Sequence, residues 1–144
     1  MFSSVLDFRP LPFLGNPHVQ TLLGNILTGG TLRVPTQLIA LRLDDGDRLV
    51  LHDSTPRGWR PGQRIAVLVH GLTGSHRSGY MQRLTGQFLR RQVRVVRVDL
   101  RGAGRGVGLA RLPYHAGCSA DIRAVLRAVH GWSPASSITL IGFS

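Results

Sequence analysis

The sequence lacks the features that would assign it to several classes of protein at once. Cys118 is its only cysteine, so no disulfide can form within the chain and a cysteine-based metal site is not expected. No apolar run approaches the ~20 residues that a membrane-spanning helix needs. Asp7 stands where a secretory signal would continue its apolar stretch. These absences predict a cytoplasmic protein without a transmembrane segment.

Lysine and glutamate are also absent. The 18 basic residues are all arginine and the 7 acids all aspartate, which gives a formal net charge of +11. Such a charge is typical of proteins that bind nucleic acid or an acidic membrane. The arginines are scattered from Arg9 to Arg127, however, and neither a zinc-finger spacing nor an aromatic RNA-binding signature accompanies them. We therefore expect no nucleic-acid partner. A noncatalytic arginine-rich binding module is kept as an alternative, and a salt-dependent DNA titration tests it.

The N-terminal residues 1–36 are predicted to form an arm, and residues 37–144 an α/β core. Prolines near the start favour an extended chain. Asn16 and Pro17 then supply an N-cap and a proline at the first helical position, and apolar residues at helical spacing follow. This pattern predicts a short helix over residues 17–27, which either packs on the core or borders a site.

The core begins with two apolar-rich segments, 37–43 and 48–52, on either side of Asp44-Asp45-Gly46-Asp47. Aspartate and glycine tolerate the positive φ of tight turns, so the pattern predicts an antiparallel hairpin. The three aspartates lack the spacing of a calcium-binding loop and its final glutamate. A plain turn is therefore expected.

The rest of the core alternates between apolar runs and amphipathic segments. Residues 65–69, 93–98 and 138–141 read as strands buried on both faces of a parallel sheet. Helices are predicted between them, over 79–91 and from a capping Ser119 to a point before Gly131. Gln92 follows the first helix, at a position where a glycine would adopt a positive φ more easily. The fold class is therefore α/β: a mostly parallel sheet with helices on both faces, preceded by an antiparallel hairpin.

A glycine-containing turn follows each of the three buried strands, at the sheet edge where sites form in such folds. The first is not a phosphate loop, because no Gly-Lys-Ser/Thr follows it. The second superficially resembles a dinucleotide fingerprint but does not open a helix. The third matches the front half of the G-x-S-x-G nucleophile elbow. The turns are His70-Gly71-Leu72-Thr73-Gly74-Ser75-His76, Asp99-Leu100-Arg101-Gly102-Ala103-Gly104-Arg105-Gly106 and Gly142-Phe143-Ser144.

In this order the three turns resemble the α/β-hydrolase fold, and the resemblance covers nearly the whole chain. Within that superfamily the chain is similar to the YheT-like, or abhydrolase-domain, branch of serine esterases and lipases. The similarity rests on the three turns together with two N-terminal motifs, Phe8-Arg9-Pro10 and Gly15-Asn16-Pro17-His18-Val19-Gln20-Thr21.

The resemblance implies a serine hydrolase that cleaves short- to medium-chain acyl esters or lipids through an acyl-enzyme on Ser144. The backbone N–H of Leu72 would be one oxyanion donor, and the residue after Ser144 would supply the second. No cofactor or metal is implied. The family's order of serine, acid and histidine places both partners after Ser144, so we expect an N-terminal half that is inactive and poorly stable alone. An acyltransferase or thioesterase on the same fold is the alternative enzyme.

His70 is the leading candidate among the histidines present for a substitute base, since the family's sheet order brings strands three and five together. A role in shaping its turn by hydrogen bonding is the stronger expectation. Asp99 and Asp121 are likewise expected to fix loop and helix geometry rather than to serve as a triad acid. The remaining histidines are weaker candidates: His18, His52, His76, His115 and His130.

Overall fold

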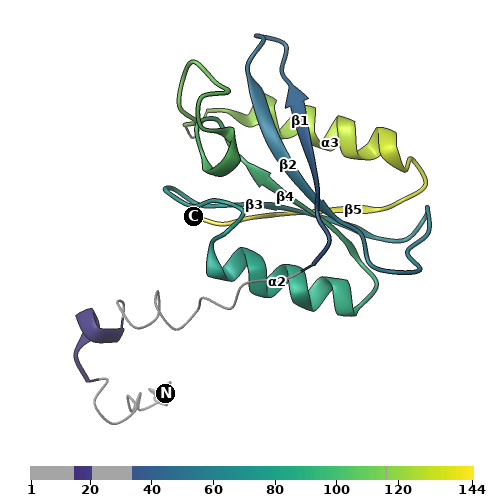
Figure 1. The fold of residues 1–144 in the computed structure, drawn as a ribbon, viewed down its shortest axis with the longest axis horizontal. Helices are drawn as coiled ribbons and strands as arrows, with labels where there is room; N and C mark the ends of the chain where they lie inside the picture. The colour runs from purple at the N-terminus through teal and green to yellow at the C-terminus, as the bar shows by residue number, and fades with distance from the viewer. Residues whose placement is uncertain (1–14, 21–33, 116) are drawn as a thin grey trace, which may run out of the picture.

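The computed structural model describes residues 15–20, 34–115 and 117–144. Within them one sheet has the strand order β1-β2-β4-β3-β5 (Figure 1). β3 pairs in parallel with β4 and β5, whereas β2 is antiparallel to both of its neighbours, β1 and β4. The predicted mostly parallel sheet with an antiparallel hairpin is confirmed. The strands are β1 (Gln37–Arg42), β2 (Arg48–Ser54), β3 (Ile65–Val69), β4 (Arg94–Asp99) and β5 (Ile138–Gly142).

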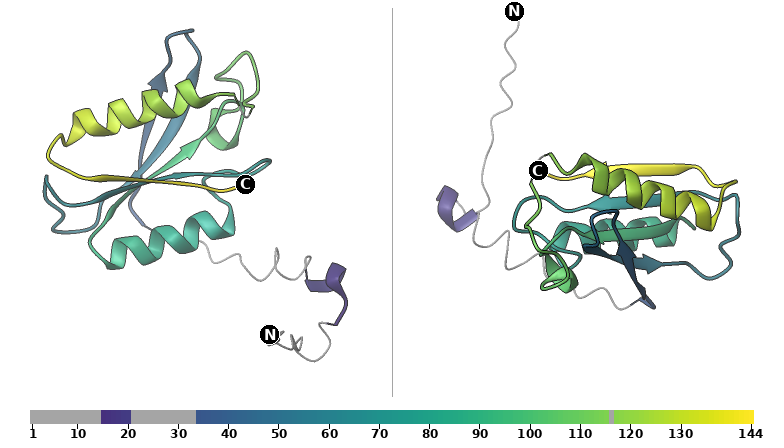
Figure 2. Two further views of the ribbon diagram at one scale, coloured as in Figure 1. Left: turned by 180° about the vertical axis from the view of Figure 1, so that it is seen from behind. Right: turned by 90° about the horizontal axis from the view of Figure 1, so that it is seen from above.

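Two helices cover opposite faces of this sheet, as expected (Figure 2). α2 (Gly79–Arg90) connects β3 to β4, and α3 (Ser119–Trp132) connects β4 to β5. The prediction that Ser119 caps α3 is wrong: Cys118 holds the N-cap position and makes no side-chain capping bond. Gly131 does not end the helix either, because Trp132 continues it and packs against the core.

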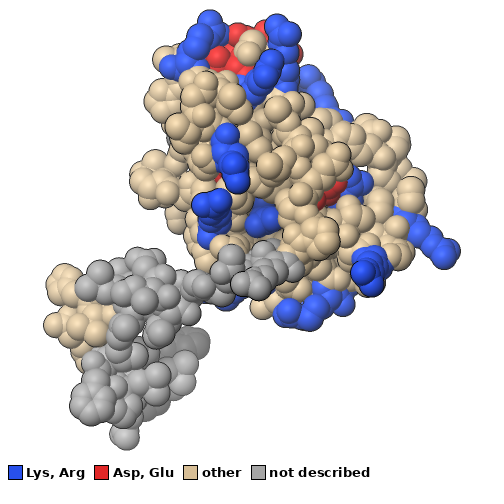
Figure 3. Space-filling view, viewed as in Figure 1, with Lys and Arg blue, Asp and Glu red and all other residues tan. Residues whose placement is uncertain are grey.

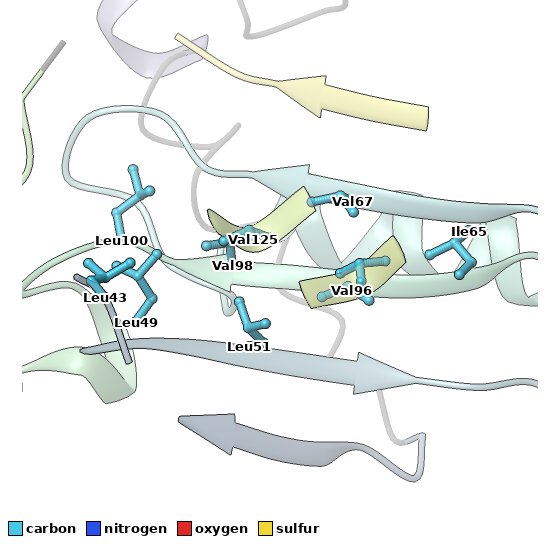
Figure 4. Packing of buried hydrophobic residues seen from close by; sticks show 10 residues of the cluster. Leu43, Leu49, Leu51, Ile65, Val67, Val96, Val98, Leu100 and Val125 are labelled. Carbon is cyan, nitrogen blue, oxygen red and sulfur yellow. The ribbon is translucent and has the colours of Figure 1, made fainter. Parts of the chain in front are cut away.

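Alternation along the strands divides the core between the two faces. Ile65 and Val67 of β3 lie on the α3 face, where they join Val96 and Val125 in the larger buried cluster (Figure 4). The intervening residues of β3 and β4 point the other way, and Met81 of α2 covers them. Burial of these aliphatic side chains supplies the main driving force for folding.

The hairpin between β1 and β2 closes as predicted, with Leu43 N–H donating to the Asp47 carbonyl over 2.8 Å. Two of its three aspartates, Asp45 and Asp47, are paired with arginines. Arg101 approaches the Asp45 and Asp47 carboxylates at 2.6 and 2.7 Å, and Arg111 lies 3.0 Å from Asp47. Basic side chains accordingly surround the acidic patch at the top of Figure 3. The hairpin turn is therefore tied to the long connection between β4 and α3, which contains both arginines.

The N-terminal helix is described only at its start. Residues 17–20 are helical, and the Asn16 side chain accepts the His18 N–H at 2.9 Å, which confirms the predicted cap. The rest of the 17–27 helix, and the extended chain before it, lie outside the described residues, and the boundary at residue 36 stays a prediction. None of the helices that the structure describes is long and apolar enough to span a membrane.

Candidate active site

Ser144 and the turn at residues 70–74 meet at the carboxyl edge of the sheet, because β3 and β5 are neighbours. The chain beyond β5 is held by the Phe143 N–H, which donates to the Val69 carbonyl over 3.0 Å. A Cβ atom built on Gly71 would lie 3.2 Å from the carbonyl carbon of Ser144. A side chain at this position would push the two segments apart by a few tenths of an ångström, which the glycine avoids. Ser144 itself is exposed.

Three N–H groups of the turn are engaged within the protein. Gly71 N–H donates to the Tyr80 hydroxyl at 3.1 Å, Thr73 N–H to the Tyr114 hydroxyl at 2.8 Å, and Gly74 N–H to the Gly71 carbonyl at 3.0 Å. The N–H of Leu72 has no hydrogen-bond partner among the described residues. Its side chain is 80% exposed, so little covers this stretch of backbone. An unused donor beside Ser144 is what an oxyanion hole requires.

His70 shapes the turn and is not a free base. Its Nε2 accepts the Leu100 N–H at 3.2 Å, which leaves Nδ1 protonated and donating to the Gly71 carbonyl at 2.8 Å. The ring is 2% exposed. Both nitrogens are therefore used to connect the turn after β3 with the turn after β4, and the predicted structural role is confirmed.

Asp99 lies completely buried at the end of β4 and is the centre of a second network. It accepts hydrogen bonds from the ring Nε2 of His52 at 2.8 Å and the ring Nδ1 of His76 at 2.7 Å. The backbone N–H groups of His76 and Arg105 also donate to it, at 2.7 and 2.9 Å. The carboxylate therefore ties β2, the turn after β3 and the turn after β4 together, as expected of a geometry-fixing acid.

The protonation states in this network follow from its contacts. Burial opposes ionisation of Asp99, but hydrogen bonds from His52 and from the Arg105 and His76 N–H groups outweigh it and hold the pKa of the carboxyl well below its usual range. Burial also lowers the pKa of the His76 imidazole, against the pull of the Asp99 charge. At neutral pH the network therefore contains an ionised Asp99 and a neutral His76.

The same residues carry the donor types of a metal site, with ligand atoms within 4.8 Å of one another. Their arrangement suits hydrogen bonding better. The two imidazole rings are stacked, with centroids 3.6 Å apart and planes at 14°, and both direct a ring nitrogen at the same Asp99 oxygen. Ligands around a tetrahedral ion would spread apart instead.

The cluster also lies away from Ser144. Asp99 ends β4 and Ser144 follows β5, with β3 between them. At ~4.8 Å per strand this separates the two backbones by about 10 Å. His52 and His76 consequently do not serve Ser144 as a base. The other described histidines, His18, His115 and His130, are exposed.

Sequence reasoning missed both the histidine cluster and the role of Arg101. The Arg101 guanidinium forms a bidentate pair with Asp121, at 2.7 and 2.8 Å, besides its contacts with the hairpin. Several contacts raise the pKa of Arg101, and the hydrogen bond with Asp121 has the largest effect. Asp121 thus fixes geometry, as predicted. The one available signal was a charged or polar residue within each apolar strand, His52 in β2 and Arg97 in β4.

Comparison with known proteins supports the fold. No protein-family model and no curated protein sequence matches the chain. Among solved structures it is similar to an α/β serine hydrolase without a lid from Xanthomonas campestris, with 22% identity and a TM-score of 0.65 over 80% of this chain and 53% of that one. An esterase of Pyrococcus furiosus shares 19% identity at a TM-score of 0.65, covering 78% and 41%.

The esterase Est1E of Butyrivibrio proteoclasticus is also similar, with 17% identity and a TM-score of 0.59 over 74% of this chain and 40% of its own. The chain therefore spans about half the length of these three solved structures or less. At these identities the likeness concerns the fold. The described residues have the architecture of part of an α/β hydrolase.

Proposed function

We propose that the chain carries the nucleophile and one oxyanion donor of a serine hydrolase that acts on carboxylic esters, in the YheT-like branch. Ser144 attacks the ester carbonyl, its hydroxyl proton passes to a histidine base, and the alcohol leaves to give an acyl-enzyme. Water then releases the acid. The observation that supports this most directly is the unused Leu72 N–H in a turn that contacts the Ser144 backbone.

The histidine and the acid of the triad are proposed to come from sequence outside these 144 residues. The His70 ring nitrogens are both engaged, and His52 and His76 donate to Asp99. A serine hydroxyl without a neighbouring base is barely nucleophilic at neutral pH. The 144-residue chain alone is therefore inactive under this proposal.

The test compares the 144-residue chain with the longest polypeptide that its gene encodes, using p-nitrophenyl butyrate as the ester. The proposal expects Ser144-dependent release of p-nitrophenol from the longer polypeptide and none from the shorter chain. Ser144→Ala should abolish turnover. Activity that survives this substitution would overturn the assignment of the nucleophile.

A pair of variants at Leu72 isolates the backbone donor. Leu72→Pro removes the N–H group, whereas Leu72→Ala keeps it and changes only a side chain that is 80% exposed. Loss of one oxyanion donor lowers kcat by about 10²- to 10³-fold. The proline variant should show this loss and the alanine variant should retain most of the activity. Equal effects of the two substitutions would remove Leu72 from the mechanism.

A further inference from the structure

The α2 face of the sheet contains a pocket that plays no part in the proposed ester hydrolysis. The strand register aligns Leu38, His52, Arg97 and Leu68 across β1, β2, β4 and β3. Met81 of α2 packs over the Leu68 end of this row. Toward β1 and β2 the row instead borders a cavity of about 410 Å³. We call it the basic pocket.

Its lining is positively charged because of three arginines, Arg77, Arg97 and Arg105. The rings of His52 and His76 also line it, whereas no carboxylate does. Three arginines of the described residues pair with carboxylates, Arg94 with Asp53 at 2.6 Å, Arg101 with Asp45 and Asp121, and Arg111 with Asp47. Within the described part of the chain, the three arginines of the pocket have no salt bridge. Like charges that gather around a concavity attract an ion of the opposite sign.

Arg97 is the residue whose surroundings point most clearly to a missing partner. It is 6% exposed, and its Nε–H has no hydrogen-bond partner. One terminal nitrogen donates to the His76 carbonyl at 3.1 Å and the other to the Thr36 hydroxyl at 3.4 Å, both neutral acceptors. Burial lowers the pKa of Arg97 and outweighs the Asp99 charge, which favours the ionised guanidinium. A buried guanidinium that no carboxylate contacts directly is costly, since desolvation is not fully repaid.

Asp99 does not fill this role. Its two oxygens already accept from His52, His76 and the Arg105 N–H, and no hydrogen bond joins it to the Arg97 side chain. The two histidines stand between its charge and the cavity, because they bond to Asp99 and line the pocket as well. With three arginines against the single charge of Asp99, the pocket keeps an excess of positive charge around a space large enough for a small anion.

We infer that the basic pocket binds a phosphate group. A dianionic phosphate offers three oxygens in different directions, which suits a cavity lined by arginines from β4 and from the turns after β3 and β4. The group can belong to a free small phosphate ester or to the headgroup of a phospholipid. The inference does not rest on the proposed hydrolase function.

The experiment measures binding to the longest polypeptide that the gene encodes by isothermal titration, with inorganic phosphate as the probe for a free ligand. Vesicles of phosphatidylcholine with and without phosphatidic acid probe the lipid source in a parallel arm. Arg77→Gln and Arg105→Gln are the main variants, because both side chains are exposed and their loss leaves the core intact. Arg127→Gln is the matched control, an exposed arginine of α3 on the opposite face.

Each of the two pocket variants should raise the Kd about threefold, and Arg97→Gln about tenfold, since charge-assisted hydrogen bonds are lost. Arg127→Gln should leave the Kd unchanged. If only the phosphatidic acid vesicles show these losses, the pocket takes a lipid headgroup. Absence of saturable binding in both arms would overturn the inference. Equal weakening by Arg127→Gln would also overturn it, because net charge alone would then explain the binding.

Discussion

Two neighbouring turns at the carboxyl edge of the sheet are held in place by different kinds of interaction. The turn after β3, residues 70–74, is fixed by neutral groups, mainly the hydroxyls of Tyr80 and Tyr114 and the ring of His70. The turn after β4 is fixed by charge, through the buried Asp99 and through Arg101. The first leaves the Leu72 N–H unused beside Ser144, whereas the one acid of the second, Asp99, accepts four hydrogen bonds.

This difference suggests a division of labour. Losing any partner of a buried charge is costly, whereas a network in which every partner is present is rigid. Such a network is suited to holding the loops of the fold in place. A site that is to bind developing negative charge needs donors without a fixed anion nearby, which a turn held by hydroxyls provides. Substitutions in the two turns should therefore differ in size.

The largest effect is expected from Asp99→Asn. The substitution replaces one acceptor oxygen with an NH₂ group that faces ring and backbone donors, and it removes the charge they solvate. Breaking a buried network of this kind costs about 3 to 5 kcal/mol. Urea unfolding followed by circular dichroism measures it. Asp44→Asn, in the exposed hairpin turn, is the control and should cost less than about 0.5 kcal/mol. Similar losses in both would show that the charge at Asp99 is not special.

The sequence predicted the turn after β3, residues 70–74, far better than the turn after β4, residues 99–106. We call them the neutral turn and the charged turn. Runs such as Ile65–Val69 and Ile138–Gly142 carry their own strand signal, so the positions of the turns after them follow from chain order alone. The Asp99 network joins residues 47 and 23 positions apart. Nothing local marks such a contact, because it depends on which strands become neighbours and on their register.

Gly104→Ala should cause the next largest loss of stability. The substitution tests how tightly the turn after β4 encloses Asp99. Gly104 has a φ of +54°, and a Cβ atom there would overlap the Asp99 carboxyl group. Strain and overpacking together should cost about 3 kcal/mol. Gly102→Ala is the matched control: its φ is +68°, but nothing lies within 4 Å of the added atom.

The control should therefore lose only the backbone term, about 1 to 2 kcal/mol. Equal losses in the two alanine variants, measured by urea unfolding, would mean that the turn yields around Asp99. The charged network would then be less rigid than its contacts indicate.

Acid should destabilise the network of Asp99, His52 and His76 in two steps. The folded state lowers the pKa of His76 below its ordinary value near 6.5, so its contribution is present above that pH and is lost as the pH falls below it. The pKa of Asp99 is lowered as well, and its contribution is lost at still lower pH, below about 4. Each step changes the free energy of unfolding by at most about 1.4 kcal/mol per pH unit.

Unfolding free energies measured from pH 8 down to about pH 5, across the ordinary pKa of histidine near 6.5, should therefore decrease toward acid. In His76→Gln this decrease should be smaller, since the variant has no imidazole at that position. An unchanged pH dependence in the variant would contradict the assignment of this step to His76.

The smallest effect is expected from relieving strain in the neutral turn. Thr73 has a φ of 59°, a left-handed conformation that is unfavourable for a β-branched residue. Thr73→Gly removes a cost of about 1 to 2 kcal/mol but gives the unfolded chain more entropy, so a net gain of up to about 1 kcal/mol is expected. Gln92→Gly is the matched control, with a φ of 58° after the end of α2 and away from the site.

Thermal unfolding of the two glycine variants separates backbone strain from a role of the Thr73 side chain. Equal gains would show that φ alone sets the effect and that the turn stores strain beside Leu72, as functional turns often do. A loss in Thr73→Gly with a gain in Gln92→Gly would mean that the threonine side chain supports the turn. The hydroxyls of Tyr80 and Tyr114 would then not be sufficient to hold it.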